Sequence, residues 1–288
     1  MPTSPDPALL SINTATVRAQ WRLPEIISAL ARHGIRGIVP WRDQVAAAGL
    51  DDAARRIRDA GLTVTGLCRG GMFPAPDREG RRAAHDDNRR AVDEAVTLGA
   101  QCLVLVAGGL PKDRSGAVVS RDLAGAREMV RDGIGVLHEY ARSAGMRLAI
   151  EPLHPMYAAD RACVNTLAQA NALCDEIAPD GKDGLGVAVD VYHVWWDPDL
   201  HAQITRAGER DRLYAYHICD WLVPTRDLLN DRGMMGDGVI DLPLIRSWME
   251  AAGYRGMHEV EIFSVLDWWK RDGDEVLATC RRRHADAS

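Results

Sequence analysis

The chain has 288 residues, 47% of them hydrophobic and 26% charged, which suits one large α/β domain with a full apolar core. Its formal net charge of −6 would repel a phosphate backbone, so we expect no nucleic-acid partner. No apolar run approaches the ~20 residues of a membrane span, so we expect no membrane partner either.

Short apolar runs alternate with amphipathic stretches along the chain. The Pro-rich residues 1–8 predict a disordered tail, and residues 9–288 predict a single domain. The predicted strands are 9–16, 35–40, 62–68, 102–106, 147–151, 186–190, 213–217 and 258–261. The predicted helices are 23–33, 51–60, 78–98, 122–144, 166–177, 199–208, 242–252 and 275–283, several closed by a glycine such as Gly34 or Gly99.

Strands that alternate with helices in this way are typical of a parallel α/β sheet. Eight such units in this length predict a closed (β/α)8 barrel, with its active site at the C-terminal ends of the strands. An open doubly wound sheet is the alternative, but the GxGxxG pattern that often follows its first strand is absent from this sequence.

The last four predicted strands each end in a carboxylate or an imidazole. These residues are Glu151, Asp190, His217 and Glu261. A single carboxylate at a strand end is more often a helix cap, but corresponding positions on consecutive barrel strands converge on one point. Three carboxylates and one imidazole suit Mn²⁺, Mg²⁺ or Co²⁺, and Zn²⁺ is possible although no thiolate belongs to the set.

Other polar and aromatic residues are expected at the same end of the barrel. His193 lies three residues after Asp190 and can turn back toward the same cavity, beside Trp195 and Trp196. Arg232 lies in a long glycine-containing loop, where its fork of donors could bind a substrate oxygen. The remaining candidates for substrate contacts follow other strands: Trp41, Arg69, His154 and Trp195.

Two acidic residues near the candidate ligands allow more than one interpretation. Asp220 follows His217 by three residues and is either an acceptor that fixes an imidazole tautomer or a turn residue. Glu259 lies two residues before Glu261, so it is expected deeper in the barrel, paired with His258 or an arginine. Six scattered cysteines without a CxxC pair predict reduced, buried thiols and a cytoplasmic location.

The motifs between residues 147 and 264 resemble those of the xylose-isomerase-like TIM barrel superfamily. The residues that carry this resemblance are Glu151, Asp190 with His193, His217, Arg232, and Glu261 followed by Ile262 and Phe263. The branch that the chain resembles is the sugar isomerase and epimerase group, with ketose 3-epimerases, hydroxypyruvate isomerase and inosose enzymes.

The resemblance implies one divalent metal ion, most often Mn²⁺, held by Glu151, Asp190, His217 and Glu261. It implies that the two glutamates are also the acid/base pair, and that His193 and Arg232 contact substrate oxygens. The predicted function is metal-dependent isomerisation or epimerisation of a ketose, keto-sugar or keto-polyol through an enediolate. The partner is then a small sugar or polyol, and a homo-oligomer is possible.

The same carbanion chemistry leaves other functions open. A leaving group β to the carbanion would make the enzyme a dehydratase or lyase on a keto-sugar, an inosose or a 3-keto-glycoside. A metal-dependent hydrolase and a non-catalytic sugar-binding barrel are the further alternatives. Solvent deuterium at a substrate carbon would distinguish an isomerase from a binding protein.

Overall fold

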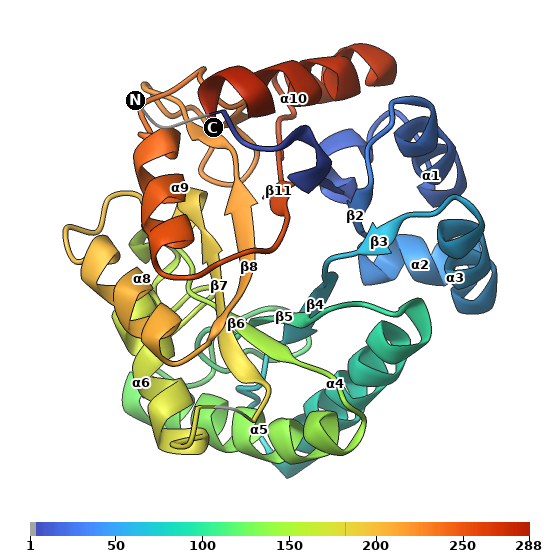
Figure 1. Ribbon diagram of the computed structural model, residues 1–288. Coiled ribbons are helices and arrows are strands. Elements are labelled where there is room, and N and C mark those ends of the chain that lie inside the picture. The colour runs from blue at the N-terminus through green and yellow to red at the C-terminus, as the bar shows by residue number, and fades with distance from the viewer. Residues whose placement is uncertain (1–3, 182) are drawn as a thin grey trace.

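The computed structural model describes residues 4–181 and 183–288 and shows a ring of strands enclosed by helices (Figure 1). The barrel strands are β1 (Leu10–Asn13), β2 (Gly37–Val39), β3 (Thr63–Val64), β4 (Leu67–Gly71), β5 (Leu103–Val106), β6 (Leu148–Glu151), β7 (Leu185–Asp190), β8 (Leu213–Ile218) and β11 (His258–Val260). They pair in the order β3-β2-β1-β11-β8-β7-β6-β5-β4, and every pairing is parallel. The predicted barrel is therefore confirmed.

The third predicted strand is divided into two parts at the seam of the barrel. β3 pairs with β2, whereas β4 pairs with β5. A parallel bridge between Trp41 and Cys68 connects the end of β2 to β4, and the backbone N–H of Cys68 donates to the carbonyl of Pro40 over 3.1 Å. These contacts bring the two edges of the sheet together, so the strand ends surround one space.

Helices cover the outside of the barrel, as the apolar spacing of the sequence predicts. They are α1 (Leu23–Arg32), α3 (Leu50–Asp59), α4 (Arg78–Leu98), α5 (Leu123–Ser143), α6 (Leu167–Ile177), α8 (Leu200–Glu209), α9 (Leu242–Ala251) and α10 (Gly273–Ala287). The side chains of Asp77, Asp122 and Thr166 accept backbone N–H groups in the first turns of α4, α5 and α6, which explains where these helices begin.

Two short helices were not predicted. α2 (Arg42–Ala48) directly precedes α3, and α7 (Val191–Val194) follows β7, with the Asp190 side chain accepting the N–H of Tyr192. The predicted tail lies partly outside the described residues, since residues 1–3 are not described. Within it, Pro7–Leu9 form a 3-10 helix capped by Asp6 and packed against α10. In the part of the chain that is described, we find no helix with the length and hydropathy of a membrane span.

The core has an outer and an inner layer. Large apolar side chains such as Ile12, Ile38 and Leu105 fill the space between strands and helices. The inner layer inside the barrel is made of small or medium side chains: Val39, Cys68, Cys102, Val104, Ala149, Ala188 and Ala215. All six cysteines are buried free thiols, as expected. The small inner layer leaves room for the polar strand ends above it.

Candidate metal centre and active site

Three neighbouring strands share one local pattern, a buried alanine followed two residues later by a candidate ligand. Successive residues of a strand face opposite sides, so the alanine and the ligand both face the barrel interior. The pairs are Ala149 and Glu151 on β6, Ala188 and Asp190 on β7, and Ala215 and His217 on β8. On β11 the alanine position is taken by Glu259, and Glu261 follows the strand.

Glu151, Asp190, His217 and Glu261, the ligand quartet, meet at one point. Each offers one ligand atom, these atoms all lie within 4.8 Å of one another, and all four residues are buried. Both ring nitrogens of His217 are buried, and neither forms a hydrogen bond within residues 4–181 and 183–288. Buried imidazole nitrogens are normally paired, so the imidazole of His217 fits a metal ligand. The quartet therefore fits one divalent cation.

Burial of several carboxylates in one place changes their protonation. Burial raises the pKa of Glu151 to about 8 and that of Glu261 to about 7, and repulsion from Asp190 adds to both shifts. Burial alone would also raise the pKa of Asp190, but attraction to Arg232 and two histidines holds it below its usual value. With pKa values near neutrality, the two glutamates hold protons for much of the time in the metal-free protein, and a bound cation would favour their ionised forms.

A carboxylate and an amide below the ligand quartet orient two of its members. Glu259 Oε2 lies 3.2 Å from His217 Nε2. The Asn13 amide donates to Glu259 over 2.7 Å and to Glu261 over 2.8 Å. The expectation that Glu259 pairs with His258 or an arginine is therefore wrong, because the register between β11 and β8 places Glu259 opposite His217. A carboxylate that holds a ligating imidazole is a common support of metal sites.

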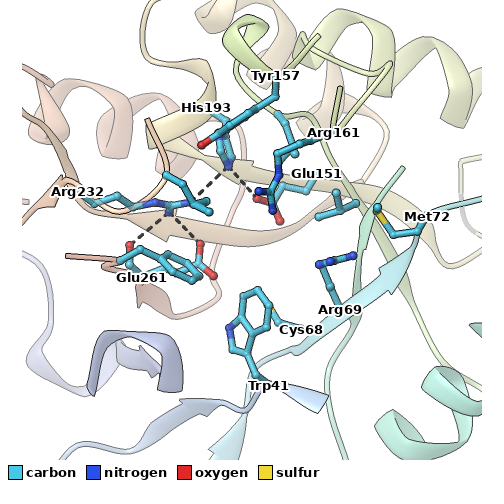
Figure 2. Close-up of a pocket in the computed structure, with 14 residues that line it drawn as sticks. Trp41, Cys68, Arg69, Met72, Glu151, Tyr157, Arg161, His193, Arg232 and Glu261 are labelled. Carbon is cyan, nitrogen blue, oxygen red and sulfur yellow. Dashed lines mark hydrogen bonds and ion pairs between the residues drawn. The ribbon is translucent and has the colours of Figure 1, made fainter. Parts of the chain in front are cut away.

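Arg232 and His193 complete the wall of the site (Figure 2). Arg232 Nη1 donates to Asp190 over 3.1 Å and to Glu261 over 2.9 Å. Its guanidinium lies 4.4 Å from the ring centre of Tyr192 and 5.1 Å from that of Phe263. His193 Nδ1 accepts the backbone N–H of His154 over 3.2 Å, which leaves the proton on Nε2, 3.6 Å from Glu151.

A pocket opens directly onto these residues. Two predicted substrate contacts, Trp41 and Arg69, line it together with Glu151, Glu261, His193 and Arg232. Trp41 Nε1 donates to Asn13 over 2.7 Å, so the indole is connected to the amide that holds Glu261. The pocket also includes residues that the sequence did not indicate: Met72, Val106, Leu153, Tyr157, Arg161 and Leu229.

Three predicted site residues outside the ligand quartet do not line this pocket. His154 stacks on Trp221 with ring centres 4.8 Å apart, and Trp195 packs against the same indole at 5.7 Å. Asp220 accepts backbone N–H groups of Trp221, Gly236, Gly238 and Ile240. This geometry favours the interpretation of Asp220 as a loop residue, with a short antiparallel pair of β9 (Asp220–Trp221) and β10 (Arg232–Gly233) that carries Arg232 to the site.

The sequence indicates the positions of some supporting residues but not the contacts that they make. Glu259 has the same two-residue spacing to Glu261 that marks the interior positions of the other strands. Tyr192 and Phe263 lie beside predicted site residues, but nothing in the sequence shows that they sandwich Arg232. Asn13 ends the first strand, 248 residues before its partner Glu261, so only closure of the barrel brings the two together.

Comparison with known proteins agrees with this architecture. The crystal structure of protein SMc04130 from Sinorhizobium meliloti 1021 has 60% sequence identity and a TM-score of 0.93, covering 98% of this chain and 99% of that one. The 3-dehydro-D-guloside 4-epimerase of Escherichia coli K12 is 27% identical over 211 residues, 72% of this chain and 74% of that protein. A crystal structure of the IOLI protein with a bound zinc atom has 20% identity and a TM-score of 0.80, covering 96% and 97% of the two chains.

The sequence profile of the xylose isomerase-like TIM barrel family matches residues 27–279, nearly the whole barrel. The match contains all four members of the ligand quartet as well as His193 and Arg232. With this match and an epimerase among its relatives, the chain belongs to the xylose isomerase-like TIM barrel family and is an enzyme of its isomerase and epimerase group.

Proposed function

We propose that this enzyme isomerises or epimerises a ketose or a related keto-sugar or keto-polyol with the help of one divalent metal ion, preferably Mn²⁺. The observation that carries the proposal is the arrangement of the ligand quartet. The strand order β11-β8-β7-β6 puts Glu261 and Glu151 at its two ends, with His217 and Asp190 between them. The two glutamates therefore approach the same point from different sides.

The donor set supports a resident metal ion. Glu151, Asp190, His217 and Glu261 would hold it, and oxygen-rich sets of this kind suit Mn²⁺, Mg²⁺ or Co²⁺. A solved structure of the same fold binds zinc, so Zn²⁺ also fits. When bound, a divalent ion would supply Lewis-acid stabilisation of the negative charge that develops on a substrate carbonyl oxygen.

We assign proton transfer to the two glutamates, Glu151 and Glu261. Glu261 is held at both oxygens, by Asn13 at Oε1 and by Arg232 at Oε2, so its position is well defined. Glu151 lies 3.6 Å from His193, a longer contact than those that hold Glu261. One glutamate removes the proton α to the carbonyl and the other returns a proton, to the opposite face in epimerisation or to the neighbouring atom in isomerisation.

Two further residues can donate hydrogen bonds to substrate hydroxyl groups. His193 presents its protonated Nε2 at the site, and Nη2 of Arg232 lies 3.4 Å from that nitrogen. Both groups can donate to substrate oxygens that flank the reacting carbon. Trp41 forms a flat wall of the pocket on which the C–H face of a sugar can stack.

Free buried thiols support a reducing, cytoplasmic environment for the enzyme.

Proton exchange with solvent tests the proposal directly. Metal-free protein would be loaded with Mn²⁺ and incubated in D₂O with ketohexoses, inososes and 3-keto-glycosides, and the products followed by NMR. We expect deuterium at the carbon next to the carbonyl, lost on chelation and restored by Mn²⁺ or Co²⁺. Loss of a β substituent would instead indicate a lyase, and water oxygen in the product a hydrolase. Equal exchange without metal would overturn the proposal.

A further inference from the structure

Two arginines line the active-site pocket without taking part in the proposed chemistry. Arg69, on β4, is half-buried, and Arg161, in the loop after β6, is exposed. We call them the arginine pair. Figure 2 shows both side chains in the pocket that contains Glu151 and Glu261. The Arg161 guanidinium lies 5.4 Å from the ring centre of Tyr157, another residue of the pocket wall.

A bulge in β4 explains why Arg69 reaches the pocket. Cys68 faces the barrel interior, so in a regular strand the next side chain would face the helices. The pairing with β5 shifts its register between Cys68 and Gly70, which leaves Arg69 as the extra residue. A Cβ atom on Gly70 would lie 2.9 Å from atoms of Asn88 and Leu105, so Gly70 takes the outward position. Bulges of this kind redirect a side chain, here toward the pocket.

The positive charge of the arginine pair is not neutralised by a neighbour. Within residues 4–181 and 183–288, neither guanidinium forms a hydrogen bond or ion pair with a carboxylate. The adjacent Asp160 is bound to Lys112 over 2.6 Å. Burial lowers the pKa of Arg69, and the like charge of Arg161 lowers it further. The carboxylate that attracts Arg69 is Glu151. A metal ion bound to Glu151 would neutralise this negative charge and weaken the attraction.

Arg232 lines the same pocket and differs from the arginine pair in having carboxylate counter-ions. Its charge is neutralised by Asp190 and Glu261. A half-buried cation without a counter-ion is unfavourable unless a ligand supplies the negative charge. Two guanidinium groups with planar donor forks match the oxygen pairs of carboxylates and phosphates.

We propose that the arginine pair binds an anionic oxygen group of the substrate, so the substrate is a keto-sugar or keto-polyol that carries a carboxylate or a phosphate monoester. The inference rests on the proposed function, because it assumes that the substrate's carbonyl group lies at the ligand quartet. The anion then lies between β4 and the loop after β6, where both arginines line the pocket.

Binding to metal-free protein tests the inference without turnover. Isothermal titration would compare D-glucose, D-glucuronate and D-glucose 6-phosphate, which share one carbon skeleton. We expect at least one of the anions to bind more tightly than D-glucose, and the stronger anion identifies carboxylate or phosphate as the source. Arg69→Gln should weaken that binding about 10- to 100-fold, the loss expected for a charge-assisted hydrogen bond. Arg69→Lys should retain part of it.

The matched control is Arg58→Gln, which removes the same charge from an exposed position on α3 and should leave binding unchanged. Circular dichroism would confirm that each variant is folded. Glucose binding as tight as that of both anions, or Arg69→Gln with wild-type anion affinity, would overturn the inference. Loss of anion binding in Arg69→Gln would support it even if no ketose exchanged protons in D₂O, a result that would count against the proposed function alone.

Discussion

The two sides of the barrel carry different kinds of groups at their strand ends. The second arc, β6, β7, β8 and β11, ends in the ligand quartet, which is buried, mostly acidic and closely packed. The first arc, β1, β2, β4 and β5, carries neutral or cationic residues at or near its strand ends: Asn13, Trp41, Arg69 and Val106. We therefore expect the two arcs to have different roles, proton transfer for the second arc and substrate selection for the first.

The two arcs meet at Asn13. Its amide nitrogen donates to Glu259 and Glu261 of the second arc, and its amide oxygen accepts from Trp41 of the first. A change on the first arc can therefore reach Glu261 through a neutral hydrogen bond. Changes within the second arc act on the charges themselves, so we expect them to have the larger effects.

Glu261→Gln should have the largest effect, because it removes a proposed ligand and proton carrier while keeping the shape of the side chain. We expect kcat to fall about 10²- to 10⁴-fold, the usual contribution of an acid/base group. Deuterium exchange measured by NMR, with the metal content determined by mass spectrometry, would report both roles. The exposed Glu139→Gln on α5 is the charge-matched control. Near-normal turnover would exclude Glu261 from the chemistry.

Arg232→Met should destabilise the metal-free protein, because it leaves Asp190 and Glu261 buried without their cationic partner. Breaking a buried ion pair from one side costs about 3–5 kcal/mol of unfolding free energy. Urea unfolding with and without Mn²⁺ would measure this loss, and added metal should recover part of it. The exposed Arg58→Met should leave the unfolding midpoint unchanged. A stable metal-free variant would show that Arg232 does not neutralise the second arc.

Metal removal should lower the stability of the whole barrel, because the ligand quartet exists only in the folded chain. At a free metal concentration about 100 times Kd the stabilisation is about 2.7 kcal/mol. Thermal unfolding in Mn²⁺, and again after chelation, would show the difference as a fall in Tm. The same chelation should leave the Tm of Asp190→Asn nearly unchanged. Identical transitions for the wild-type protein would exclude a resident ion at this site.

The opposite end of β11 should respond to pH in the neutral-to-acid range. Burial lowers the pKa of His258 to about 4 and that of His284 to about 3, and their rings share a hydrogen bond of 3.0 Å. Because the unfolded chain binds these protons near pH 6.5, the unfolding free energy should fall as the pH drops from about 6.5 toward 4.

The slope is up to about 1.4 kcal/mol per pH unit for each additional proton bound by the unfolded chain. His284→Gln removes one of the two sites and should reduce the slope in this range. Urea unfolding of both proteins at a series of pH values would measure it. An unchanged slope would mean that the histidine pair contributes nothing to the acid sensitivity of the barrel.

Trp41→Phe should have the smallest effect of the series. It removes the hydrogen bond to Asn13 but keeps an aromatic wall, and the Asn13 oxygen still accepts the N–H of Ala15. One neutral hydrogen bond contributes about 1 kcal/mol, so kcat/KM should fall roughly fivefold. Trp248→Phe, on α9 and away from the pocket, is the matched control. A loss as large as that in Glu261→Gln would contradict the division between the arcs.

Much of the second arc could be predicted from the sequence. Glu151, Asp190 and His217 each end a short apolar run, and parallel barrel strands place such ends together. His154 and Trp195 also follow strands, but they pack on Trp221 and do not line the pocket. Nearness to a strand end does not determine the direction of a loop, because loop direction depends on contacts with other loops.

The sequence alone determined the barrel and the identity of the proposed metal ligands, because strand periodicity is local and repeats along the chain. Only the tertiary structure decided how those ligands are held. The Asn13 contact to Glu261, the pairing of Glu259 with His217 and the bulge that turns Arg69 inward all depend on the register between strands. Register is set by packing across the whole barrel, and no short stretch of sequence contains it.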